Sequence, residues 1–173
     1  MAAQIAAVIS ADVIGSSTMN PATRKKLQGV LDGFSRWAMA TWPGLEIQQY
    51  RGDSLQATLT TNTWSALRIG LLLQSMLIKE GLGIRLAVGT GTVSFKSRDI
   101  ITSDGSAFRA SGPYLDQIRK NGEVISVAGD DPQFTGEWQV HSASLNFIIQ
   151  HWTMQQAEAV YLQLQDHTQQ QIA

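Results

Sequence analysis

Residues 5–17 read IAAVISADVIGSS, a short apolar run that ends in an aspartate and a glycine–serine turn. Isoleucine, valine and alanine in a run of this length, stopped by turn residues, predict a buried β-strand over 5–14. Asp12 is therefore expected at the strand end, held by the backbone but reaching solvent. Asp53 occupies a similar place in the turn of QYRGDSL at 49–55. Two such carboxylates repel each other unless a cation lies between them, so the pair indicates a divalent-metal and nucleotide-phosphate site.

The composition is typical of a soluble globular protein. Of 173 residues, 43% are hydrophobic and 16% charged, enough for one core-bearing domain with a small addition. Lysine and arginine total 13 against 14 acidic residues, so no overall field attracts nucleic acid or an anionic membrane. The absence of cysteine excludes disulfides, thiolate zinc sites and thiol nucleophiles. With no signal-peptide pattern, and an apolar stretch at 69–78 too short to span a bilayer, we expect a cytoplasmic protein without membrane contact.

The spacing of apolar residues predicts the order β-α-β-β-α-β, followed by one more helix and strand. Asn20 as N-cap and Pro21 at the first helical position mark the first helix, and Gly52-Asp53 marks a hairpin turn. Pro113 predicts that the last of these helices breaks or restarts near residues 111–113. The expected elements are strand 5–14, helix 21–41, hairpin strands 45–51 and 55–60, helix 63–78, strand 84–93, helix 107–120 and strand 123–128.

A hairpin between two crossover helices predicts a ferredoxin-like α+β fold, in which an antiparallel or mixed sheet carries helices on one face. We assign this domain to residues 1–128 and place the boundary in the Gly-, Asp- and Pro-rich stretch 129–137. Apolar residues at helical spacing predict further helices over 140–173, where Thr168 begins a helix with few apolar positions. Our hypothesis is that 140–173 holds the truncated start of a helix-turn-helix module; a natural polar C-terminal tail is the alternative.

The stretch after the first strand supplies several oxygen and nitrogen donors. The Asp12 carboxylate and the neighbouring Val13 carbonyl are hard oxygen ligands of the kind that Mg²⁺ or Mn²⁺ prefers. The turn formed by Gly15, Ser16 and Ser17 offers backbone amides and hydroxyls to phosphate oxygens. The alternative is that each aspartate only ends its strand and bonds its own turn. In a split sheet the first strand neighbours the hairpin, so Asp12 and Asp53 are expected to converge and hold a triphosphate through a cation.

Three motifs resemble those of class III nucleotide cyclases. DVIGSS at 12–17 resembles their Asp-Ile-Val-Gly-Ser/Phe-Thr loop, and RGDSL at 51–55 resembles their Gly-Asp-Gly/Ser hairpin and, more distantly, that of diguanylate cyclases. LAVGTGTV at 86–93 is similar to their Gly-Ile-His-Thr-Gly-Glu-Val strand. Order and spacing match over about the first 128 residues. The resemblance implies the cyclase-like fold, a metal site at Asp12, Val13 and Asp53, and a homodimer with sites at its interface.

The last cyclase motif departs from the family. Its Gly-x-x-Val-Asn-x-x-x-Arg helix uses Asn to orient the ribose and Arg to stabilise transition-state charge. Here Asp116 stands at the Asn position and Lys120 at the Arg position. A carboxylate repels a polyphosphate unless it binds metal, and lysine lacks the planar fork of arginine. Arg109 and Arg119 are further candidates for phosphate contact, with solvated helix arginines as the alternative. If the domain were active, its catalytic residues would be Asp12, Asp53, Asp116 and Lys120.

A closer resemblance is to the SatD-like proteins, bacterial relatives of the cyclase fold. It rests on DGSAFRASGPYL at 104–115, WTMQQ at 152–156 and TQQQIA at 168–173, and covers nearly the whole chain. It implies a cyclase-like sensory domain coupled to a DNA-reading module. Our hypothesis is a non-catalytic regulator that binds a nucleotide or phosphorylated small molecule, and contacts DNA only through that module. An active nucleotide cyclase or other nucleotidyl or phosphoryl transferase, and a dimerisation scaffold without ligand, are the alternatives.

Overall fold

A five-stranded mixed sheet forms the centre of the molecule in the computed structural model, which describes residues 4–50, 52–94, 97 and 99–172. The strand order is β2-β3-β1-β4-β5; β1 runs antiparallel to β3 and β4, and β4 runs parallel to β5. The split order and the β2–β3 hairpin confirm the predicted fold class. Arg51 of the hairpin turn lies outside the described residues. The strands are β1 (Gln4–Val13), β2 (Leu45–Tyr50), β3 (Ser54–Leu59), β4 (Ile84–Val93) and β5 (Ile125–Gly129).

The main core lies between the sheet and two helices, α1 (Pro21–Thr41) and α2 (Ala66–Lys79). Alternate residues of β1, from Ala7 to Val13, point into this core because side chains alternate across a strand. The first helix begins as predicted, since the Asn20 side chain accepts a hydrogen bond from the Thr23 amide at 2.8 Å. The two crossover helices therefore lie on one face, as the sequence predicts.

The helix α3 (Ser106–Asn121) packs on the other face of the sheet from α1 and α2, over β4. The break predicted near Pro113 is wrong, because α3 continues through this residue. At Gly89 the helix approaches the sheet closely: a Cβ there would lie 2.2 Å from the Ala107 carbonyl oxygen and 2.6 Å from the Ser111 amide. The helix therefore packs on β4 at backbone distance, and it tolerates the hydrogen bond that Pro113 cannot donate.

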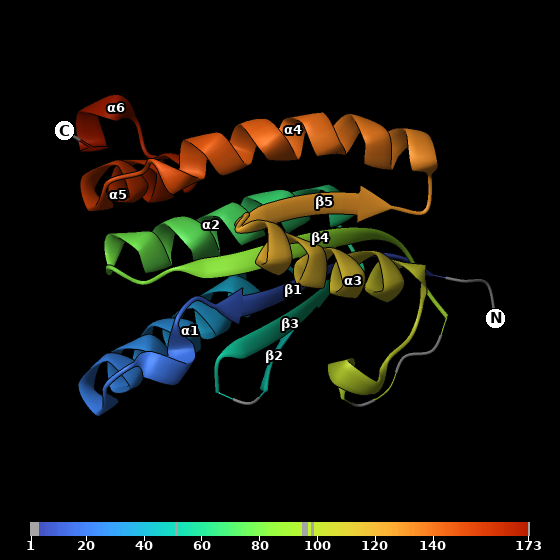
Figure 1. The fold of residues 1–173 in the computed structure, drawn as a ribbon, viewed down its shortest axis with the longest axis horizontal. Helices are drawn as coiled ribbons and strands as arrows, with labels where there is room; N and C mark the ends of the chain where they lie inside the picture. The colour runs from blue at the N-terminus through green and yellow to red at the C-terminus, as the bar shows by residue number, and fades with distance from the viewer. Residues whose placement is uncertain (1–3, 51, 95–96, 98, 173) are drawn as a thin grey trace.

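The outer edge of β5 is closed by α4 (Pro132–Gln150), which runs beside it (Figure 1). Asn146 accepts from the Val124 and Ile125 amides at 2.7 and 3.0 Å and donates to the Ile125 carbonyl at 2.9 Å. Ser142 and Thr135 bind further backbone groups of the same strand. Side chains of α4 therefore satisfy the donors and acceptors that an edge strand leaves open.

The helix that follows α4, α5, lies against α2 (Figure 1). The capping box that opens α5 (Met154–Gln163) joins the side chains of Thr153 and Gln156 to each other's backbone amides. Arg68 of α2 donates to the Leu164 carbonyl at 2.6 and 2.9 Å, and this holds the turn before α6 (Gln169–Ile172). The division into 1–128 and 140–173 stays a prediction. Within the described ranges, none of the helices is long and apolar enough to cross a membrane.

Candidate metal and phosphate site

The Asp12 carboxylate is buried at the end of β1. The strand is paired on both sides, with Ser54 of β3 and Arg85 of β4 opposite Asp12. Only 7% of the residue is exposed. One carboxylate oxygen, Oδ1, is buried and has no hydrogen-bond partner among the described residues. An unpartnered buried carboxylate oxygen costs free energy, so this oxygen is the clearest sign of a place for a ligand.

Asp53 lies beside the same strand end. Its backbone carbonyl accepts a hydrogen bond from the Val13 amide at 2.9 Å, which fastens the hairpin turn to β1. Its carboxylate accepts from the Ser16 hydroxyl at 2.5 Å, and more weakly from the Ser54 hydroxyl at 3.4 Å. The structure therefore brings Asp12, Val13, Ser16 and Asp53 to one edge of the sheet.

Two arginines surround the Asp12 carboxylate. Arg119 of α3 donates to Oδ2 at 2.6 Å, and Nη1 of Arg85 lies 3.9 Å from the same oxygen. The Asp12 hydrogen bond and charge, helped by the charges of Asp116 and Asp53, raise the pKa of Arg119 above its ordinary value. Because both Asp116 and Asp53 act on this guanidinium, the three acidic residues and Arg119 form one electrostatic cluster.

A divalent cation fits this donor set only with help from other ligands. Among the described residues, no group of three or more His, Cys, Asp or Glu side chains is placed to hold a metal ion. Among these residues, Asp12 Oδ1 has no hydrogen-bond partner, and the Asp53 carboxylate accepts hydrogen bonds from the hydroxyls of Ser16 and Ser54. Mg²⁺ commonly uses one or two carboxylates, completes its shell with water and substrate phosphates, and needs no all-protein cage. The residues present match that pattern.

The loop after β1 forms a short 3₁₀ turn, η1 (Ser16–Thr18). Gly15 begins it at φ 70°, a left-handed conformation that glycine adopts without strain. Arg24 of α1 donates to the Ser16 carbonyl at 3.0 Å, which adds a positive charge beside the loop. Ser17 is exposed on the same turn. Gly15, Ser16 and Ser17 thus lie next to the carboxylates, with a basic residue that the sequence did not single out.

The remaining predicted site residues are spread along α3. Asp116 and Lys120 are exposed, three residues before and one residue after Arg119. Arg109 lies ten positions before Arg119, about 15 Å along the helix, and pairs with Asp104 at 2.7 Å. The structure therefore places Arg109 away from Asp12 and puts Arg119 on the carboxylate instead.

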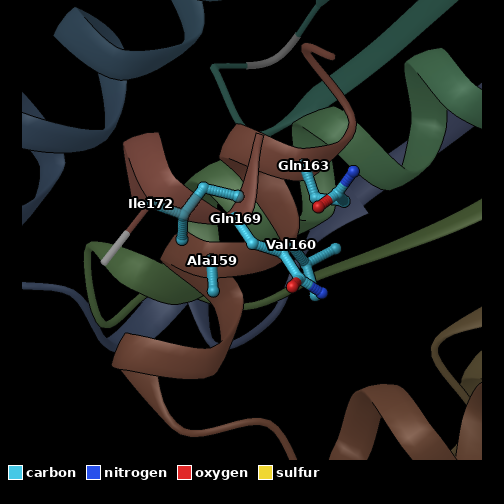
Figure 2. A pocket seen from close by; sticks show the side chains of 5 residues that line it. All are labelled: Ala159, Val160, Gln163, Gln169 and Ile172. Atoms are coloured by element: carbon cyan, nitrogen blue, oxygen red, sulfur yellow. The ribbon is translucent and has the colours of Figure 1, made fainter. Parts of the chain in front are cut away.

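The apolar groove between α5 and α6 has a different chemistry (Figure 2). Its volume is about 380 Å³, and none of its lining residues carries a charge. Ala159, Val160 and Ile172 make most of its wall, with Gln163 and Gln169 beside them. This groove offers no group that binds phosphate or a cation, so the site at Asp12 is the one that matches the predicted ligand.

Comparison with known proteins shows the fold. No protein-family model matches the chain, and no curated protein does. A bacterial light-regulated adenylyl cyclase aligns with a TM-score of 0.56 at 16% identity, over 72% of this chain and 75% of its own. The monomeric guanylyl cyclase domain of RhoGC from Blastocladiella emersonii aligns with a TM-score of 0.54 at 12% identity, over 83% of this chain and 86% of its own. The active GGEEF domain of a diguanylate cyclase from Vibrio cholerae aligns with a TM-score of 0.51 at 14% identity, over 74% of this chain and 84% of its own.

The fold is that of nucleotide cyclase domains. The chain is therefore a nucleotide-cyclase-like domain by architecture, as its motifs predict. At these identities the likeness concerns the fold alone, and the identity of the site residues rests on their own geometry.

Sequence reasoning missed two arginines of this cyclase-fold domain, Arg24 and Arg85, and did not connect Arg119 with Asp12. Arg85 stands in the apolar run ILE-ARG-LEU-ALA-VAL at 84–88, where a charged residue inside a buried strand is the signal that was available. Arg119 was named as a candidate for phosphate contact, with a solvated helix arginine as the alternative, and not as a partner of Asp12. Its role depends on α3 crossing the second face of the sheet, which periodicity along one helix does not reveal.

Proposed function

We propose that this chain is a regulatory domain that binds a nucleotide, or another phosphorylated small molecule, together with Mg²⁺ or Mn²⁺. Asp12, Asp53 and the Val13 carbonyl hold the cation, and the loop of Gly15, Ser16 and Ser17 contacts phosphate. The observation that carries this proposal is the buried, unpartnered Oδ1 of Asp12 at the strand end to which the Asp53 backbone is hydrogen-bonded.

Binding would proceed by exchange at Asp12. Arg119 now neutralises the carboxylate, and its side chain is 53% exposed, so it can leave without opening a hole in the core. A cation that takes its place on Asp12 frees the guanidinium for a phosphate, which arginine binds through parallel hydrogen bonds. Arg119 thus neutralises the Asp12 carboxylate when the site is free, and a phosphate when ligand is bound.

The residues at the two remaining cyclase motif positions do not favour catalysis. The cyclase resemblance puts Asp116 at the ribose-orienting position and Lys120 at the charge-stabilising position. Asp116 adds negative charge next to Arg119, which opposes the approach of a polyphosphate. Lys120 follows Arg119 directly on α3 and is rotated about 100° from it around the helix. We therefore assign this site to binding.

Calorimetric titration with Mn²⁺, alone and then with ATP or GTP, tests the proposal. The wild-type protein is expected to bind Mn²⁺ and to bind the nucleotide more tightly when Mn²⁺ is present. Asp12→Asn and Asp53→Asn should each lower Mn²⁺ affinity at least tenfold. Asp104→Asn is the matched control, because Asp104 also pairs with an arginine of α3, at 2.7 Å. Equal affinities in all four proteins would contradict the proposal.

An active nucleotide cyclase or nucleotidyl transferase is the second candidate. The fold and the aspartate pair favour it. Incubation with each nucleoside triphosphate and Mg²⁺ or Mn²⁺ separates the two candidates. Cyclic nucleotide or pyrophosphate, lost in Asp12→Asn, would establish catalysis and overturn a purely binding role. A protein that binds neither cation nor nucleotide would instead be a dimerisation scaffold.

The DNA-directed part of the proposal concerns α5 and α6. The Gln171 side chain accepts hydrogen bonds from the amide and hydroxyl of Thr168 at the start of α6, and Asp166 turns the chain before it at φ 65°. We propose that these helices belong to a helix-turn-helix, as the SatD-like resemblance implies, and that DNA is contacted there. The coding region downstream of Ala173 tests this: a further amphipathic helix supports it, and a stop codon contradicts it.

A further inference from the structure

A polar cleft lies between α3 and α4, with β5 as its floor. Both helices pack on β5, which lies between them in Figure 1. The cleft has a volume of about 280 Å³, close to the lower end of the range of small-molecule sites in proteins. It is separate from the metal and phosphate site, because Arg119 lies about 140° around α3 from Tyr114, which lines the cleft.

Polar side chains surround this cleft from four segments of the chain. They come from α3, from the residues before β5, from β5 itself and from α4. The six are Tyr114, Gln117, Asn121, Glu123, Ser126 and Gln139. None of these side chains makes a hydrogen bond or an ion pair with another described residue. Their donors and acceptors are therefore free for a ligand.

Ser126 is the most informative of the six, because it is buried. It is 8% exposed and stands in β5 between Ile125 and Val127, which belong to the main core. Side chains alternate across a strand, so Ser126 points to the opposite face of the sheet, where it lines the cleft. Buried side-chain hydroxyls are normally hydrogen-bonded. The Ser126 hydroxyl has no such partner among the described residues, so a partner is expected within the cleft.

The charge of the lining selects the ligand class. Glu123 is the one charged side chain among the lining residues, and these include no lysine or arginine. A phosphorylated ligand is therefore repelled. A carboxylate only accepts hydrogen bonds, whereas amides and hydroxyls both donate and accept them. The complementary ligand is a molecule without negative charge that carries several hydroxyl groups.

We propose that this cleft binds a small neutral polyhydroxy molecule of the monosaccharide class. The Glu123 carboxylate accepts from ligand hydroxyls, and Ser126 exchanges a hydrogen bond with another. Gln139 and the amides of α3 contact the outer side of the ligand. The cleft exists before the ligand arrives, because Asn146 fastens α4 to the β5 region through hydrogen bonds of 2.7 to 3.0 Å. No folding of a loop is needed to form it.

This site goes beyond the proposed function and does not rest on it. The cation and phosphate residues come from β1, the loop after it and the β2–β3 turn, and none of them lines the cleft. Sugar binding is measured without metal or nucleotide. Asp12→Asn, which should lose Mn²⁺ affinity, is expected to bind the sugar as the wild type does, so the two proposals can fail separately.

Calorimetric titration of the whole chain with glucose, galactose, mannose and ribose tests the proposal. At least one of the four is expected to bind with a dissociation constant below about 1 mM. The phosphate ester of that sugar should bind roughly tenfold more weakly, because Glu123 repels the added charge. No binding of any of the four sugars, or a phosphate ester that binds equally or more tightly, would overturn the proposal.

Two variants locate the site. Ser126→Ala and Gln139→Ala each remove a hydrogen-bonding group from the cleft and should weaken sugar binding roughly five- to tenfold. Gln139 is exposed, so its replacement leaves folding intact, and thermal melts check both variants. Ser144→Ala is the matched control, since it removes the same hydroxyl from α4 outside the cleft, where Ser144 donates to the Val140 carbonyl. Unchanged affinity in either cleft variant, or an equal loss in Ser144→Ala, would contradict this site.

Discussion

Arg119 of α3 and Asp12 of β1 are joined by a hydrogen bond of 2.6 Å across 107 positions of sequence. The contact ties the helix on the second face of the sheet to the strand end that carries the candidate site. It leaves one Asp12 oxygen paired and the other buried without a described partner. Arg119 therefore has two roles: it links α3 to β1, and it competes with a ligand for Asp12. Substitution of Arg119 tests the second role.

Arg119→Gln should tighten Mn²⁺ binding. The guanidinium competes with the cation for the carboxylate, and an ion pair of this exposure contributes at most about 1 kcal/mol, or roughly fivefold in affinity. The same variant should weaken nucleotide binding, because a phosphate partner is lost. Calorimetry with Mn²⁺ and then with nucleotide measures both. Arg109→Gln serves as control, since its partner is Asp104; an identical response of the two variants would refute the assignment.

Gly89→Ala should destabilise the protein by about 2–3 kcal/mol, a typical cost of overpacking. The new methyl group would meet the backbone of α3, 2.2 Å from the Ala107 carbonyl oxygen, and backbone cannot turn aside as a side chain does. Gly29→Ala in α1 is the control with the opposite sign. Its Cβ has no neighbour within 4 Å, and alanine favours a helix by about 0.5–1 kcal/mol. Urea denaturation of both variants should show opposite shifts in the free energy of unfolding.

Asn146→Ala should lower the free energy of unfolding by about 2–4 kcal/mol. The side chain accepts from two amides and donates to one carbonyl of the edge strand region, and buried groups left unpartnered cost about 1–3 kcal/mol each. Gln150→Ala removes an exposed bond from the same helix to the Gly122 carbonyl and should cost less than about 1 kcal/mol. Equal losses in the two variants would show that α4 does not satisfy the edge of β5.

The Lys26–Glu80 pair predicts a dependence of stability on acid. The hydrogen bond and charge of Lys26 lower the pKa of the Glu80 carboxyl below its ordinary 4.5. The contribution of the Glu80 carboxylate to the free energy of unfolding is therefore present above pH 4.5 and is lost as the pH falls through the pKa of the folded state. Glu80→Gln should cost only about 0.5 kcal/mol at pH 7, because the side chain is 34% exposed and screened. Urea unfolding at pH 7 and pH 3 should show this difference disappear; a constant difference would contradict it.

Local signals predicted the elements well where neighbouring residues determine the structure. Asn20 and Pro21 start α1 because a cap and a fixed φ act within one turn. The hairpin at Gly52 forms because only a few conformations join two adjacent strands, and Gly52 takes φ 77° there. From these elements it followed that the first strand neighbours the hairpin, and the backbone hydrogen bond from Val13 to Asp53 joins them.

Contacts between distant elements were not predictable in the same way. Pro113 argued for a break in α3, but packing of Ser111 over Gly89 holds the helix together. The pairing of Arg85 and Arg119 with Asp12 depends on which face each element covers, and so does the closing of β5 by Asn146. No local sequence pattern predicts these contacts, because they arise from tertiary packing.

Location of Mn²⁺ by anomalous X-ray scattering from crystals grown with Mn²⁺ and a nucleotide tests the central claim most directly. The account predicts one strong peak at the end of β1, within about 2.0–2.6 Å of carboxylate oxygens of both Asp12 and Asp53, with Arg119 moved from Asp12 to the phosphates. A strong peak elsewhere, or an Asp12–Arg119 pair unchanged at saturating Mn²⁺ and nucleotide, would contradict it.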